Sequence, residues 1–144
     1  MKASDIMTAH EVWACSQSDD VRHVAQLMAQ HDVGSIPLLD ESGRLDGIVT
    51  DRDIVLRIVA LGRSFETPAR EIMSQPVYFC TPDAKPAEIE ALMQEHKVRR
   101  VPVVDDKRKL LGFISIGDLA KHYHGLRREH HLAEVLEAVS TPVW

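Results

Sequence analysis

Two short stretches of the chain carry the same pair of hydrogen-bonding residues at the same spacing. Thr50 and Asp53 follow one apolar run, and Ser115 and Asp118 follow another 65 residues later. A carboxylate at the start of a helix can accept charge-assisted hydrogen bonds from the two hydroxyls of a ribose, each contributing roughly 1.5–3 kcal/mol. The hydroxyl three residues earlier can donate to a phosphate, and free helix N-terminal amides favour anions. The same residue types are ordinary helix caps, so the spacing leaves a ligand site and a structural cap both open.

The duplicated pair belongs to a duplicated sequence. Residues 27–40 align with residues 92–105 at an offset of 65, and the same offset carries Gly47 onto Gly112. Further upstream, residues 6–7 (Ile-Met) match residues 72–73 (Ile-Met) at an offset of 66. Because chance does not keep one register over so many positions, the chain consists of two copies of one unit.

Each copy predicts the order β-α-β-β-α. A short strand is expected around residues 12–15 and 77–80, and an amphipathic helix follows it, capped in the first copy by Asp19 or Ser18. Two apolar strands joined by a charged turn come next, at 36–39 and 45–49 and again at 101–104 and 110–114. A helix over about 51–61 or 117–124 closes each copy. A three-stranded sheet with helices on one face leaves its other face open, so the copies are expected to pack sheet to sheet.

The hydrophobic-Pro strand and the Gly-h-h-Thr/Ser-x-x-Asp ending of each copy resemble CBS domains, which occur in tandem pairs called Bateman modules. The resemblance implies a mixed α+β fold with repeats at 3–62 and 69–124, a linker at 63–68 and a helical tail at 125–144. Residues 47–55 and 98–103 are similar to small stand-alone CBS-pair proteins of bacteria, including the hypoxic-response type, which is a stress-response class. No room remains for a catalytic domain, so the chain is not expected to be an enzyme.

The resemblance also implies a ligand. CBS pairs commonly bind adenosine-bearing molecules (AMP, ADP, ATP, S-adenosylmethionine or NAD) in two clefts between the repeats, as sensors of energy or metabolic state. Carried over residue by residue, one cleft would combine Thr50 and Asp53 with residues of the second copy: Gln75, Tyr78, Val98, Arg99 and Arg100. The other would combine Ser115 and Asp118 with residues of the first copy: Ala9, Trp13 and Val33 to Ser35. Guanidinium groups bind phosphate bidentately, so phosphorylated adenosines are expected to prefer the first cleft.

Composition and sequence motifs argue against several other classes of protein: nucleic-acid-binding, membrane-spanning, secreted and catalytic. The formal charge of −5 gives no basic footprint for nucleic acid. No apolar run approaches the roughly 18 residues of a membrane span, and the N-terminus does not read as a signal peptide, so a cytoplasmic location is expected. Cys15 and Cys80 lie far apart and are expected to be buried thiols. No nucleophile–base set and no Gly-rich phosphate loop is found.

Eight histidines raise a metal hypothesis, most strongly at His122-x-His124 and His130-His131. Neither pair has the i, i+4 spacing that aims two imidazoles of a helix at one zinc ion, and no Cys pair joins them. The sequence therefore predicts no metal site and no required cofactor. A metal or redox sensor using the histidines or the two cysteines remains an alternative.

Apolar helix positions suggest association with a partner. Ile54, Ile58 and Leu119 are expected on exposed helix faces, and they predict a homodimer with an isologous interface. A further apolar face in the tail consists of Leu132, Val135, Leu136 and Val139 and could cover either the chain's own core or a protein partner. The competing function is a dimerisation scaffold whose clefts are degenerate and bind nothing.

Overall fold

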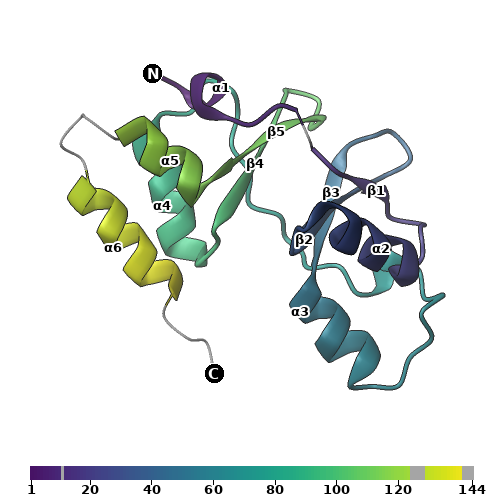
Figure 1. The fold of residues 1–144 in the computed structure, drawn as a ribbon. Coiled ribbons are helices and arrows are strands. Elements are labelled where there is room, and N and C mark those ends of the chain that lie inside the picture. The colour runs from purple at the N-terminus through teal and green to yellow at the C-terminus, as the bar shows by residue number, and fades with distance from the viewer. Residues whose placement is uncertain (11, 124–128, 141–144) are drawn as a thin grey trace. The chain divides into compact units, whose positions relative to one another are not determined.

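The computed structural model describes residues 1–10, 12–123 and 129–140, without the side chains of 129–131 (Figure 1). Its contacts divide the chain into two compact units. Residues 13–77 form one, called here the Asp53 unit. Residues 1–12 and 78–144 form the other, called the Asp118 unit. The expected sheet-to-sheet packing of the copies stays a prediction.

The Asp53 unit is a three-stranded sheet with a helix before and after its hairpin. Its elements are β1 (Cys15–Ser16), α2 (Val21–His31), β2 (Ser35–Leu39), β3 (Leu45–Thr50), α3 (Asp51–Ile54), a π-helical turn η1 (Val55–Val59) and a 3-10 turn η2 (Ala69–Glu71). Strand β1 is parallel to β2, and β2 is antiparallel to β3. The predicted hairpin is confirmed. The predicted first strand is shorter than expected and lies at Cys15–Ser16.

Helix α2 begins one or two residues later than the sequence suggested. The carboxylate of Asp20 accepts a hydrogen bond from the His23 N–H at 2.9 Å, so Asp20 is the N-cap. The predicted caps, Asp19 and Ser18, are wrong. Asp19 instead turns back and accepts from the Ser16 N–H at 3.0 Å. The helix buries Val21, Val24 and Met28 in the core of this unit.

The Asp118 unit is built from the first residues of the chain and the second copy. Its elements are α1 (Ala3–Ile6), α4 (Pro86–His96), β4 (Arg100–Val104), β5 (Leu110–Ser115), α5 (Ile116–Tyr123) and α6 (Glu129–Ser140). The antiparallel β4–β5 hairpin and the early helical position of Pro86 confirm their predictions. The strand predicted at 77–80 is wrong: in the described residues it amounts to a single parallel bridge between Cys80 and Val103.

The tail helix packs on its own unit. Figure 1 shows α6 running beside α4 and α5. Val135 is fully buried and Val139 nearly so, in one cluster with Tyr123, whereas Leu136 is 43% exposed. Of the two uses that the sequence left open for the tail, packing against the chain's own core is therefore confirmed.

The leading segments of the two copies are exchanged between the units. Thr8, which precedes the first copy, forms an antiparallel bridge with Phe113 of the second. Ser74, the counterpart of Thr8 at an offset of 66, forms the same bridge with Ile48 of the first copy. Each unit is thus completed by the segment that the sequence assigns to the other copy.

The predicted apolar surface is partly wrong. Ile58 and Leu119 are fully buried, and Ile54 packs against the core of its unit. The exposed apolar side chains of this helix are instead Val55, Leu56 and Val59. Ile54 and Ile58 are four residues apart and share one helix face, and this face packs on the core of the unit while the opposite face is exposed. No helix within the described residues is long and apolar enough to cross a membrane.

Candidate functional site

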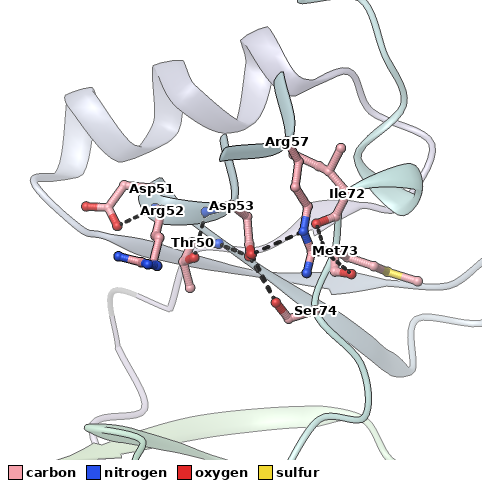
Figure 2. Close-up of polar contacts among 8 residues, drawn as sticks. All are labelled: Thr50, Asp51, Arg52, Asp53, Arg57, Ile72, Met73 and Ser74. Carbon is pink, nitrogen blue, oxygen red and sulfur yellow. Dashed lines mark hydrogen bonds and ion pairs between the residues drawn. The ribbon is translucent and has the colours of Figure 1, made fainter. Parts of the chain in front are cut away.

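Thr50 and Asp53 form a reciprocal cap where β3 passes into α3 (Figure 2). The Asp53 carboxylate accepts from the Thr50 N–H at 2.9 Å, and the Thr50 hydroxyl accepts from the Asp53 N–H at 3.1 Å. The structural cap that the sequence left open is therefore present. It also fixes the orientation of the carboxylate at the helix N-terminus, where free amides lie close by.

Asp53 is held on its other side by the exchanged segment. The Ser74 hydroxyl donates to the carboxylate, with both oxygens at 3.1 Å. The Arg57 guanidinium lies 3.9 Å from Asp53 Oδ1 and is anchored by donation to the Ile72 carbonyl at 2.9 Å. Asp53 is only 8% exposed. Figure 2 shows the carboxylate between Thr50, Ser74 and Arg57.

Ser115 and Asp118 repeat this arrangement in the other unit. The Asp118 carboxylate accepts from the Ser115 N–H at 2.8 Å and from the Ser115 hydroxyl at 2.9 Å, and the Asp118 N–H donates back at 3.1 Å. The Thr8 hydroxyl donates to Asp118 at 3.5 Å, in the place that Ser74 takes beside Asp53. This last contact is longer and weaker.

Two further predicted residues directly follow the hydroxyl residues that contact Asp118 and Asp53. Ala9 follows Thr8 and is exposed, and Gln75 follows Ser74 and donates to the Asp46 carbonyl at 3.0 Å. The structure therefore places Gln75 in the same unit as Asp53, and Ala9 in the same unit as Asp118.

Apart from the two aromatic residues, the remaining predicted residues lie at the start of the strand that pairs with each motif, or directly before it. Ser35 pairs with Thr50, and the Gly34 carbonyl accepts from the Asp51 N–H at 3.0 Å. Arg100 pairs with Ser115, and the Arg99 carbonyl accepts from the Ile116 N–H at 3.1 Å. Both arginines are exposed, while Val33 and Val98 pack partly against the cores of their units. The assignment of Arg99 and Arg100 to the ligand beside Asp53 stays a prediction.

Both predicted aromatic residues are stacked on histidines. Trp13 lies on His31 with ring centroids 3.5 Å apart, and Tyr78 lies on His96 at 3.4 Å, each pair nearly parallel. Neither stacked pair is among the sequence-based predictions. The signal was available, because Trp13 and Tyr78 are 65 residues apart and so are His31 and His96.

The two cysteines are buried free thiols, as predicted. Burial, reinforced by the negative charge of Glu88, raises the pKa of Cys80 to about 11. Burial and then the charge of Asp19 raise the pKa of Cys15 to about 11 as well. Beside Cys80 the Asp118 unit has an open hollow of about 460 Å³, lined by Phe79, Cys80, Thr81, Ala84, Glu88, Ala91, Leu92 and Glu95.

The comparison with known families agrees with the duplicated geometry. The model of the CBS domain matches residues 3–60 and 69–125. The chain belongs to the CBS-domain family. Both matches start ahead of the capped helices, so the family's sequence unit includes the leading segment that packs on the other copy.

Relatives of this CBS pair match between four fifths and nearly all of the chain. CBS domain-containing protein YhcV of Bacillus subtilis is 41% identical over 81% of this chain and 81% of its own length. Hypoxic response protein 1 of Mycobacterium tuberculosis is 34% identical over 98% of this chain and 95% of its own.

Solved structures show the same fold. The crystal structure of Hypoxic Response Protein I with two coordinated zinc ions has a TM-score of 0.76 at 35% identity, covering 85% of this chain and 98% of that one. The CBS domain pair of protein MJ0100, in complex with 5′-methylthioadenosine and S-adenosylmethionine, has a TM-score of 0.74 at 24% identity, covering 88% and 98%.

Proposed function

We propose that this CBS pair is a non-catalytic sensor module of the cytoplasm that binds adenosine-containing nucleotides beside Asp53 and Asp118. The observation that carries the proposal is the repeated carboxylate at a capped helix N-terminus. In both units a backbone N–H and a hydroxyl fix the aspartate, so an approaching ribose would meet an acceptor whose rotamer is already ordered. A CBS pair of the same fold, MJ0100, binds two adenosyl ligands.

The proposed ribose acceptor has capacity left for a ligand. An ionised carboxylate offers about four lone-pair positions. Among the described residues, the donors closest to Asp53 are one backbone N–H and one hydroxyl, with the Arg57 guanidinium farther away. The arginine and the Thr50 hydroxyl supply charge and polarity around the carboxylate. Tyr78 and Trp13, each stacked on a histidine, are the candidate stacking partners for the adenine base.

Calorimetric titration with AMP, ATP and adenosine tests the proposal on the wild type and a matched pair, Asp53→Ala and Asp118→Ala. We expect Asp53→Ala to weaken every ribose-bearing ligand by about tenfold to a hundredfold, the equivalent of roughly 1–3 kcal/mol. Arg100→Ala should weaken AMP and ATP much more than adenosine and flatten the salt dependence. Asp83→Ala is the control, because Asp83 lies on the surface with 86% of its side chain exposed.

Three results would redirect the assignment. Unchanged AMP affinity in both Asp53→Ala and Arg100→Ala would remove the primary site beside Asp53. Loss of all binding in Asp118→Ala alone would move that site to the other unit. If the wild type bound none of AMP, ADP, ATP, S-adenosylmethionine or NAD, the module would instead be a scaffold with degenerate clefts.

We also propose that the chain forms a homodimer through the exposed apolar surface of η1. Val55, Leu56 and Val59 are 54%, 48% and 60% exposed, and Leu61 and Phe65 follow them on the surface. Apolar side chains gathered in this way mark interaction surfaces. Light scattering should give about twice the chain mass of 16.2 kDa for the wild type, and a mass near 16.2 kDa for Val59→Glu. Leu136→Glu, on the exposed side of α6, should leave the dimer intact. A monomeric wild type at micromolar concentration would remove this proposal.

A further inference from the structure

Three metal-binding residue types meet where β1 passes into α2. Cys15 lies in β1, Asp19 in the turn that follows, and His23 in the first turn of the helix. One ligand atom from each lies within 4.8 Å of the other two, and His23 Nε2 is 4.0 Å from Asp19 Oδ2. The geometry points to a binding site for one divalent transition-metal ion, such as Zn²⁺, at Cys15, Asp19 and His23.

The donor set suits such an ion. Thiolate, imidazole and carboxylate are the three ligand types of protein-bound zinc, and three protein ligands leave a fourth position open. Ligand atoms around a tetrahedral zinc ion lie about 3.2–3.8 Å apart, given metal–ligand bonds of about 2.0–2.3 Å. The atoms here therefore need to approach by about 1 Å or a little more. His23 is exposed and can make that adjustment by rotating its own side chain.

The surrounding backbone holds the three residues in place. The Ser16 N–H donates to Asp19 Oδ2 at 3.0 Å, and the Ala69 N–H donates to the Asp19 carbonyl at 2.8 Å. The Asp20 cap fixes the backbone of His23 at the helix start. Cys15 is 4% exposed, whereas Asp19 is half-buried, so the cluster opens outward on the side of the histidine. Contacts of this kind orient ligands before a metal arrives.

The second copy supplies a matched control inside the same molecule. At the offset of 65, Cys80 corresponds to Cys15, but Ala84 stands in place of Asp19 and Glu88 in place of His23. That position keeps the buried thiol and lacks the imidazole. Binding should therefore occur at one copy only, with one ion per chain at saturation.

Cobalt titration of the full-length, chelator-treated protein tests the inference. Co²⁺ bound by a thiolate in a tetrahedral site gives a charge-transfer band in the near ultraviolet and intense visible absorption. Added zinc should displace the cobalt and abolish both absorptions. We expect one equivalent of cobalt in the wild type, loss of the charge-transfer band in Cys15→Ser, and at least tenfold weaker binding in His23→Ala and Asp19→Asn. Cys80→Ser and Glu88→Gln should bind as the wild type does.

Further variants keep the result decisive. His23 is exposed, so His23→Ala should fold even if Cys15→Ser does not, and circular dichroism checks both. Substitution of His130 and His131 together tests the histidines of the tail, and binding should survive it. A charge-transfer band that persists in Cys15→Ser, disappears in Cys80→Ser, or depends on the tail histidines would overturn the site. So would a wild type that binds no cobalt.

Discussion

The two units use one backbone plan to hold two carboxylates in unequal surroundings. Asp53 and Asp118 both stand at the third position after a capping hydroxyl. Beside Asp53, however, Ser74 donates at 3.1 Å and Arg57 lies 3.9 Å away, whereas beside Asp118 the Thr8 hydroxyl is 3.5 Å away and His122 occupies the position of Arg57. Duplication thus kept the strand-to-helix cap and changed the side chains around it, so the two carboxylates differ in charge environment and not in backbone setting.

Substitutions at Gly112 and Gly47 test most strongly whether the two leading segments, around Thr8 and around Ser74, are held equally firmly. A methyl group at Gly112 would meet the Thr8 carbonyl oxygen at 2.6 Å, and that backbone is tied to Phe113 by two hydrogen bonds. A methyl group at Gly47 would meet the side chain of Met73, which is flexible. We expect Gly112→Ala to lower the free energy of unfolding by about 3 kcal/mol, and Gly47→Ala by about 1 kcal/mol. Urea unfolding of both variants measures the difference. Equal losses would show that the two leading segments are equally adaptable.

The thiol of Cys80 predicts a stability change in mildly alkaline solution. Its pKa is raised from 9.0 to about 11 in the folded chain, mainly by burial. Between these values the unfolded state has lost the proton and the folded state still holds it, so stability falls as the pH rises. The loss should approach about 3 kcal/mol above pH 11 and should be negligible at pH 8 and below. Chemical unfolding at several pH values compares the wild type with Cys80→Ala, in which the part due to this thiol should vanish. An unchanged pH dependence in the variant would contradict the assignment.

The hydroxyls of Ser74 and Thr8, which contact Asp53 and Asp118, should contribute unequally to the free energy of unfolding, with a smaller difference than that expected between the two glycine variants. Ser74→Ala removes a donor from the nearly buried Asp53, and we expect a loss of about 1–2 kcal/mol in the free energy of unfolding. Thr8→Val removes only a 3.5 Å contact to the more accessible Asp118, so its cost should be about 0.5 kcal/mol or less. Thermal unfolding of both variants measures the pair. A larger loss in Thr8→Val would reverse the order of the two sites.

Local patterns in the sequence determined much of this protein. The offset of 65 residues revealed the duplication, and the apolar runs with Pro37 and Pro102 gave both hairpins. The Thr/Ser-x-x-Asp spacing gave both caps and both candidate carboxylates. These features depend on residues a few positions apart, whose hydrogen bonds and side-chain periodicity follow from chain geometry alone.

Contacts between distant residues were decided only by the tertiary structure. Nothing in the spacing of Thr8 or Ser74 indicated that each would bridge to the other copy, because a single bridge leaves no periodic pattern. The four-residue spacing of Ile54 and Ile58 put both on one helix face, but only packing against the core decided that this face is buried. Cys15, Asp19 and His23 are spaced four residues apart, as on one helix face, but they lie in a strand, a turn and a helix, so this spacing alone does not bring their side chains together. They come together because α2 folds back against β1, and burial of its apolar face, a non-local interaction, holds it there.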